Sequence, residues 1–256
     1  MPRMLFISCL ILFWAPWASA QLNESDTVQL QLRASLTGMR QAGNVDFFSL
    51  SSSLVASTHL GPFAFKSQNS VRYQAFAGNA TDNDLDTRNF LYYNCRKTVY
   101  PYLYGIASSN FRRQISMRYL FGAGMTAQIL QKPEHVVKIG ASVCYEQSTF
   151  TENSFNFDAY DGNAVVPLGR GTLWLYGTHR WSDQVHFFYE AFGQPAFSDL
   201  NNYRIHAQLG LDVKLIQNLS LSASYLWNRE QLVVEGIQQD DQILTFGLSY
   251  SYRSKR

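Results

Sequence analysis

The chain has 256 residues and five histidines, the side chains most often used as general bases in hydrolysis. In one class of membrane hydrolase, the histidine comes two positions before the nucleophilic serine. No histidine here has a serine two residues later, and the patterns G-x-S-x-G and H-E-x-x-H are absent. A hydrolytic site would have to be assembled from separate strands, so hydrolysis remains an alternative. The histidines are His59, His135, His179, His186 and His206.

Three aspartates at alternate positions have the spacing that opens a calcium-binding loop: Asp82, Asp84 and Asp86. Such a loop also needs glycine at its sixth position and glutamate at its twelfth. This chain has Thr87 and Tyr93 there. We therefore expect a solvated acidic loop and no metal.

The segment GAGMTA (122–127) fits a loose form of the glycine-rich dinucleotide fingerprint. That fingerprint works only between a strand and a helix, where the helix N-terminus meets the pyrophosphate. Here it lies inside a predicted strand. We expect Gly122 and Gly124 to make room for a large side chain opposite, and we expect no cofactor.

Basic residues recur on the polar face of the predicted strands. Ten bases fall there against four acids, an excess of six positive charges. Such a face can line a pore that prefers anions, or it can form a salt-bridged plug that fills a small barrel. Asp86 is one of the four acids. The other residues expected to line the lumen are Arg33, Lys66, Arg72, Arg88, Arg118, Lys138, Glu146, Arg170, Arg180, Glu190, Arg204, Asp212 and Lys214.

These side chains would be positioned by strands. Twelve segments alternate with a period of two, which indicates strands with two different faces. Many have the length of a tilted membrane strand, about nine to eleven residues, whereas strands of globular proteins usually have about five or six. The segments are 27–38, 45–58, 63–76, 85–94, 99–109, 115–130, 136–147, 168–181, 185–194, 203–215, 219–230 and 241–252.

The connections differ in length between the two ends. With a periplasmic N-terminus, the periplasmic connections are short: 61–62, 95–98, 131–135, 182–184 and 217–218. The outer connections include the longer segments 77–84, 148–163, 195–202 and 231–240, with short exceptions at 41–44 and 110–113. This is the pattern of outer-membrane barrels. The last strand would then pair with the first, so that no edge stays free.

The composition and the N-terminus agree with export to a membrane. The chain has 18 Phe and 15 Tyr, and charged residues make up 16%, against a usual value of about 25%. Residues 1–20 predict a signal peptide, with Arg3, an apolar stretch and ASA before Gln21. The net charge of +2 gives no argument for nucleic acid.

Two cysteines remain in the expected mature protein, Cys95 and Cys144. The predicted strands place them at opposite ends of the barrel. A disulfide needs Cα atoms within about 7 Å. We therefore expect two free thiols.

Several stretches carry a family resemblance: 43–54, 118–130, 135–146, 203–227 and 236–252. In them the chain resembles the domain-of-unknown-function 481 family, described as salt-induced outer-membrane proteins. The resemblance spans nearly the whole expected mature chain. It implies an outer-membrane barrel of a Gram-negative bacterium and supplies no catalytic residue.

Together these features predict an all-β fold, a transmembrane antiparallel up-and-down β-barrel of about twelve strands in the cell outer membrane. The expected parts are a signal peptide (1–20), the barrel (21–252) and a basic tail (253–256). The leading interpretation is a structural protein or a narrow diffusion pore with a basic lumen. The alternatives are an outer-membrane hydrolase and an exported soluble ligand-binding β-protein. Expected partners are outer-membrane lipid and lipopolysaccharide, the barrel-assembly machinery and, for a pore, small anions.

Overall fold

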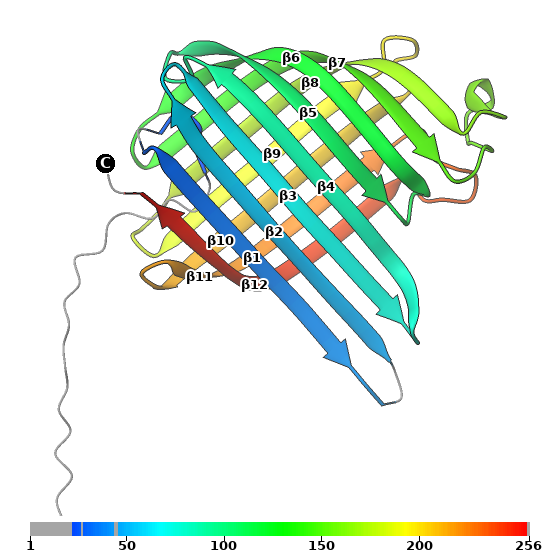
Figure 1. Cartoon of the computed structure of the whole chain (residues 1–256), viewed down its shortest axis with the longest axis horizontal. Coiled ribbons are helices and arrows are strands. Elements are labelled where there is room, and N and C mark those ends of the chain that lie inside the picture. Colours follow the sequence, from blue (N-terminus) through cyan, green and yellow to red (C-terminus); the bar gives the residue numbers. More distant parts are fainter. Residues whose placement is uncertain (1–21, 27, 44–45, 255–256) are drawn as a thin grey trace, which may run out of the picture.

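The computed structural model describes residues 22–26, 28–43 and 46–254, and the predicted signal peptide lies outside them. In these residues twelve antiparallel strands close into a barrel (Figure 1). The strands are β1 (Leu30–Gln41), β2 (Phe47–Leu60), β3 (Phe63–Phe76), β4 (Asn79–Tyr93), β5 (Val99–Asn110), β6 (Ile115–Gln131), β7 (His135–Phe150), β8 (Val165–Arg180), β9 (Val185–Pro195), β10 (Tyr203–Ile216), β11 (Leu219–Glu230) and β12 (Asp240–Arg253). A short 3-10 helix, η1 (Asp158–Tyr160), lies in the β7–β8 connection.

The barrel is closed by pairing of β1 with β12, as the sequence predicts. The ladder runs from Gln31 opposite Arg253 to Leu36 opposite Leu248. Beyond Leu36, β1 pairs with β2 alone. The pairing extends past the predicted end of the barrel, because the Ser254 N–H donates to the Leu30 carbonyl at 2.9 Å.

The outer surface of the barrel is apolar and the inner surface is polar. Alternate side chains project outward, including Phe121 with 76%, Leu173 with 71% and Phe246 with 65% of its surface exposed. In contrast, the charged Arg170 is only 1% exposed, inside the barrel. This arrangement inverts that of a water-soluble protein and fits a barrel surrounded by lipid. Within the described residues, no helix is long and apolar enough to cross a membrane.

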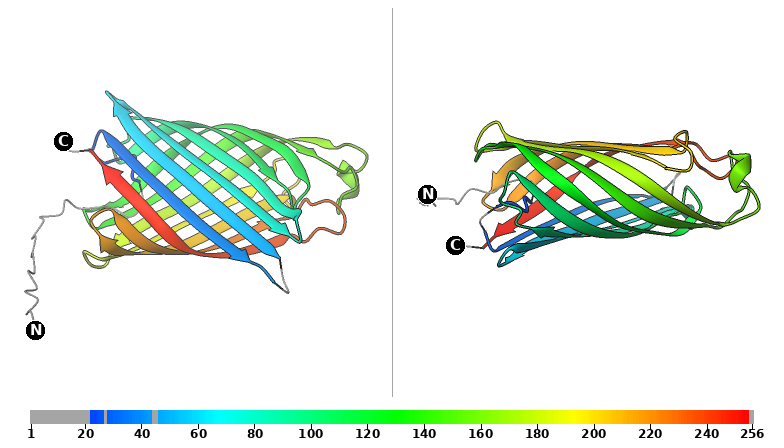
Figure 2. Two further views of the ribbon diagram at one scale, coloured as in Figure 1. Left: turned by 60° about the horizontal axis from the view of Figure 1, so that its bottom comes forward. Right: turned by 90° about the horizontal axis from the view of Figure 1, so that it is seen from above.

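The two ends of the barrel differ in their connections. The end where β12 finishes, here called the turn end, has connections 61–62, 94–98, 132–134, 181–184 and 217–218. The opposite end, here called the loop end, has the long connections 151–164, 196–202 and 231–239. These long loops gather at one end in both views of Figure 2.

The β3–β4 connection is shorter than predicted. The sequence predicts a loop over 77–84, but β4 begins at Asn79 and leaves a two-residue turn. Ala77 and Gly78 both have positive φ, 48° and 78°, as the favoured two-residue hairpin turn requires. Asp82 and Asp84 are therefore strand residues, and the predicted solvated acidic loop is wrong.

An aromatic cluster fills part of the lumen beside β6. Phe90 and Tyr104 stack with ring centroids 5.9 Å apart, and Tyr104 lies opposite Gly122 of β6. A Cβ at Gly122 would come within 2.4 Å of the Tyr104 ring, and one at Gly124 within 2.8 Å of the Tyr102 ring. The prediction that these glycines make room for large side chains is confirmed.

Candidate functional site

The residues before β1, Leu22–Asp26, fold into the turn end of the lumen, and we call them the N-terminal plug. A side-chain turn shapes them: the Ser25 N–H donates to Asn23 Oδ1 and the Asp26 N–H to the Asn23 carbonyl, both at 3.1 Å. Leu22, Glu24 and Ser25 are 2%, 5% and 4% exposed. The plug is thus packed inside the barrel.

Glu24 is the anchor of the N-terminal plug. Its carboxylate accepts hydrogen bonds from Lys138 Nζ of β7 at 2.8 Å and from the Tyr100 hydroxyl of β5 at 2.7 Å. Lys66 Nζ of β3 lies 3.9 Å away. Burial raises the pKa of Glu24, but the charges of Lys138 and Lys66 and these hydrogen bonds outweigh it and lower the pKa to about 2. Glu24 therefore stays ionised at neutral pH and ties the plug to three strands.

Above the plug lies a cavity of about 490 Å³, here called the chamber. It reaches from Leu22 to Thr37 and Asn110 near the loop end. Among the described residues, eight basic and four acidic side chains line it. The bases are Arg33, Lys66, Arg72, Arg88, Arg113, Arg118, Arg204 and Arg229, and the acids are Asp84, Asp86, Glu190 and Glu230.

Ion pairs connect strands across the lumen. Arg88 of β4 contacts Asp86 at 2.8 Å and Glu190 of β9 at 3.8 Å. Arg33 of β1 binds both carboxylate oxygens of Asp212 of β10, at 2.7 and 3.0 Å. Such bidentate pairs fix the side chains as well as neutralising them.

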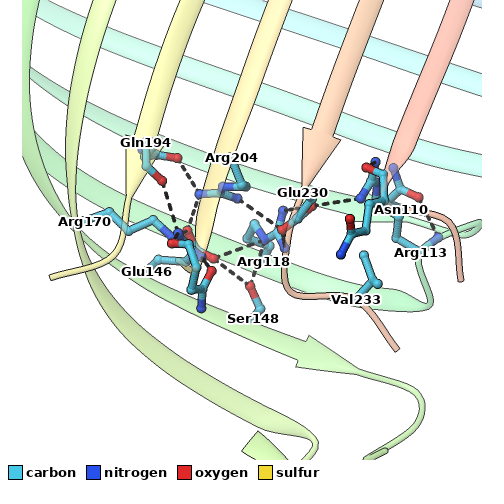
Figure 3. A network of polar contacts seen from close by, with 12 residues as sticks. Asn110, Arg113, Arg118, Glu146, Ser148, Arg170, Gln194, Arg204, Glu230 and Val233 are labelled. Atoms are coloured by element: carbon cyan, nitrogen blue, oxygen red, sulfur yellow. Dashed lines mark hydrogen bonds and ion pairs between the residues drawn. The ribbon is translucent and has the colours of Figure 1, made fainter. Parts of the chain in front are cut away.

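At the loop end, four arginines surround two glutamates in what we call the arginine network (Figure 3). Glu146 of β7 accepts a hydrogen bond from Arg170 Nε at 3.0 Å and is also bound by Arg204. Arg118 links it to Glu230 of β11, with Nη1 donating to Glu230 Oε2 at 3.2 Å. The network is completed by Arg113, whose Nη1 lies 3.6 Å from Glu230 Oε2. It therefore joins β6, β7 and β8 to β10 and β11 across the lumen.

The long loops cover the arginine network with apolar side chains. The connections 151–164 and 231–239 meet in a bridge between Phe155 and Val234. Phe155 packs on Phe150 with ring centroids 4.8 Å apart. Leu232 belongs to the same buried cluster. This cover lies over the arginine network, and the lining of the chamber continues beyond it to Thr37 of β1, Arg72 of β3 and Asn110 of β5.

The predicted lumen residues fall into groups. Arg33, Lys66, Arg72, Arg88, Arg118, Glu190 and Arg204 line the chamber. Glu146 and Arg170 are in the arginine network, Lys138 holds the plug, and Asp212 pairs with Arg33. Arg180 pairs with Glu134 at 3.5 Å, and Lys214 follows Asp212 on the same face of β10.

The expected excess of six positive charges is too large. The predicted count leaves out four acids, Glu24, Asp82, Asp84 and Glu230, which pair with Lys138, Arg112, Arg72 and Arg118 respectively. It also leaves out two bases of the chamber wall, Arg113 and Arg229, so among the described residues twelve bases face eight acids and the excess is four. Glu230 could have been found, because alternation along β11 points it inward. Asp82 and Asp84 fall in the segment 77–84 that the sequence predicts as a loop, and Glu24 precedes every periodic segment. The chamber itself still holds more bases than acids.

The five histidines do not converge on one point. His59 contacts the Glu24 carbonyl at 2.6 Å, and His206 Nδ1 contacts Asn228 Oδ1 at 2.7 Å. His135 and His179 contact each other through their Nδ1 atoms at 3.1 Å. Across the described ranges, no group of three or more His, Cys, Asp or Glu side chains is arranged to hold a metal.

Comparison with known proteins gives a family and a fold. Residues 34–252 match the model of a family described as "Protein of unknown function, DUF481". A comparison with curated protein sequences found no match. The NanC porin has 12% identity and a TM-score of 0.52, covering 86% of this chain and 98% of the porin. The translocator domain of the autotransporter NalP from Neisseria meningitidis has 12% identity and a TM-score of 0.45, covering 88% of this chain and 89% of the domain. Similarity at the level of the porin shows a shared barrel fold.

Proposed function

The chain belongs to the DUF481 family of proteins of unknown function, and we propose that this member is an outer-membrane pore for small anions that its own N-terminal plug closes. In this proposal the turn end faces the periplasm and the loop end faces outward. Residues 1–20 would direct export and be removed before Gln21. The plug would then lie close to the new N-terminus.

The observation that carries this proposal is the chamber with its charge. Eight bases and four acids among the described residues surround about 490 Å³ that reaches the rim at the loop end. A surplus of positive charge along a narrow path favours anions over cations. Arg204 lines the chamber and is 9% exposed as a residue. Its Nε has no hydrogen-bond partner within the described residues. Buried donors generally find partners, and a passing anion could serve as one.

The N-terminal plug explains how such a path would be closed. It is bound to β3, β5 and β7 through Glu24 and to the β4–β5 turn, where the Ser25 hydroxyl donates to the Cys95 carbonyl at 2.6 Å. The plug is not a strand of the barrel wall. It can therefore leave the lumen without breaking a strand ladder.

Reversal potential in planar bilayers under a salt gradient tests the selectivity. We expect anion preference in the parent protein and a reduced preference in Arg72→Glu. Arg72 lines the chamber and has 26% of its side chain exposed. The control is Arg40→Glu, which makes the same charge change at a side chain 56% exposed near the rim. Cation preference in the parent protein, or no conductance even after deletion of 22–26, would overturn the proposal.

A further inference from the structure

Four polar side chains lie on the outer face of β3 and β4, and we call them the outer polar patch: Ser67, Asn69, Thr87 and Asn89. In the strand register Ser67 is opposite Asn89, and Asn69 is opposite Thr87. All four occupy odd-numbered positions, as does Leu91 of β4, which is 41% exposed on the outside. The patch therefore projects away from the lumen.

The outer polar patch lies within the apolar belt. On β3 it is bordered by Phe65, 44% exposed, and Val71, 47% exposed. On β4 it is bordered by Leu85 and Leu91, 45% and 41% exposed. Apolar side chains thus flank it toward both ends of the barrel. Lipid tails provide no hydrogen-bond partners at this depth, so polar groups there are costly unless another molecule pairs with them.

Bonds within the patch use only part of its capacity. Asn69 Nδ2 donates to Ser67 Oγ at 3.0 Å, and the Thr87 hydroxyl donates to Asn69 Oδ1 at 2.7 Å. Asn89 Nδ2 donates to Thr87 Oγ1 at 3.3 Å. Two carboxamides and two hydroxyls carry six polar hydrogens. Among the described residues these three bonds leave three hydrogens and the Asn89 carbonyl oxygen for an outside partner.

We propose that the outer polar patch is a contact surface for a second copy of this chain, docked patch to patch about a two-fold axis. A two-fold interface must be self-complementary. This patch meets that condition, because each asparagine presents both donors and an acceptor. The same patch on a second copy of the chain can therefore supply both the donors and the acceptors that the first patch needs.

The surroundings of the patch allow close approach of another barrel. Three of its four cross-strand neighbours are small: Ala56 opposite Ser67, Gly105 opposite Asn89, and Ala107 opposite Thr87. The fourth, Leu54 opposite Asn69, is 50% exposed and would pack at the edge of the contact. Small residues let backbones in a membrane come near enough for side-chain hydrogen bonds. At the loop end, the connections above this face are the short ones, 77–78 and 111–114. The long loops start from strands on the other side of the barrel.

Cysteine cross-linking in lipid vesicles tests the geometry. The variant Asn69→Cys is reconstituted as purified full-length mature protein and oxidised. Native Cys95 and Cys144 are buried, so the new thiol is the accessible one. The matched control is Leu209→Cys in β10, at a lipid-facing side chain 49% exposed on the far side of the barrel. We expect a cross-linked dimer for Asn69→Cys and none for the control.

A second variant tests the hydrogen bonds. Asn69→Leu combined with Asn89→Leu makes the patch apolar, which suits lipid. The barrel should still fold, as seen by its mobility shift on gels with heating. The dimer, measured in vesicles for the parent protein and the double variant by amine-reactive chemical cross-linking, should be lost in the double variant. Equal cross-linking at positions 69 and 209, a monomeric parent protein in vesicles, or an undiminished dimer in the double variant would each overturn the proposal. Because the parent protein is purified, a patch used by a different protein would leave it monomeric.

Discussion

Neutralising Glu24 should open the lumen. The variant Glu24→Gln keeps the size of the side chain and removes the charge that Lys138 and Lys66 bind. The pKa of Glu24 falls from 4.5 to about 2 in the folded barrel. That difference corresponds to about 3 kcal/mol of interaction between the carboxylate and its surroundings. If the N-terminal plug leaves the lumen when the pore opens, Glu24→Gln should lower the ratio of closed to open barrels by up to about a hundredfold.

The same group predicts a pH dependence with a definite sign. The pKa of Glu24 in the barrel lies below its ordinary value of 4.5. The stabilisation of the closed state is therefore complete above about pH 4.5 and is lost as the pH falls from 4.5 toward 2. Acid should open the parent protein within that window. The variant, which has no carboxyl group at position 24, should lack this transition.

Single-channel recording in planar bilayers measures the open probability directly. The control is Glu134→Gln, which removes a turn-end carboxylate that is 59% exposed and pairs with Arg180 outside the plug. A mobility shift on heating would show that each variant forms a barrel. If Glu24→Gln and the parent protein had the same open probability at pH 7 and the same acid profile, Glu24 would not hold a gate.

Three further predictions concern the barrel itself. Leu209→Arg, on the lipid face, should lower the free energy of unfolding in vesicles by about 2–4 kcal/mol, whereas Gln208→Arg, on the chamber wall, should lower it less. Equal losses in a folding titration would refute the assigned faces. Arg170→Met should remove one of the three arginine partners of Glu146 and the donor to the buried Gln194 and Asn202 carbonyls. It should lower the free energy of unfolding by about 1–3 kcal/mol, measured by urea denaturation in detergent. Cys95 and Cys144 should be free thiols, and a 95–144 disulfide found by mass spectrometry would contradict that prediction. Because burial raises the pKa of Cys95, iodoacetamide should label Cys95 slowly until the barrel is unfolded.

The barrel wall could be predicted because its signal is local. Period-two alternation needs only neighbouring residues to assign a strand and its two faces. For this reason β6 and β7 lie close to their predicted ranges, and β12 closes on β1. The β3–β4 connection was predicted wrongly because NATDND is rich in residues that favour turns, while Ala77 and Gly78 alone make the turn. Pairing with β3 extends β4 through that segment.

The outer polar patch could be predicted from the sequence only in part. The alternation of β3 places Ser67 and Asn69 on the same face as Phe65 and Val71, so their exposure could be read from the sequence. Their grouping with Thr87 could not. That depends on the register of β3 with β4, which brings Asn69 opposite Thr87. A polar residue on one strand is unremarkable, but four on adjacent strands form a surface.

The contents of the lumen could not be predicted in the same way, because they depend on partners far apart in the chain. Arg118 and Glu230 are 112 residues apart, and Arg33 and Asp212 are 179 apart. Alternation points each of them inward without saying which of them meet. The N-terminal plug has no periodic pattern at all, yet Glu24 provides the charge that two lysines need. Whether the lumen conducts or is closed therefore depends less on the strands than on the five residues of the N-terminal plug. In the proposed mechanism the lumen is closed at the turn end while Leu22–Asp26 lie inside it, and the chamber that remains when they leave has the surplus positive charge of an anion path.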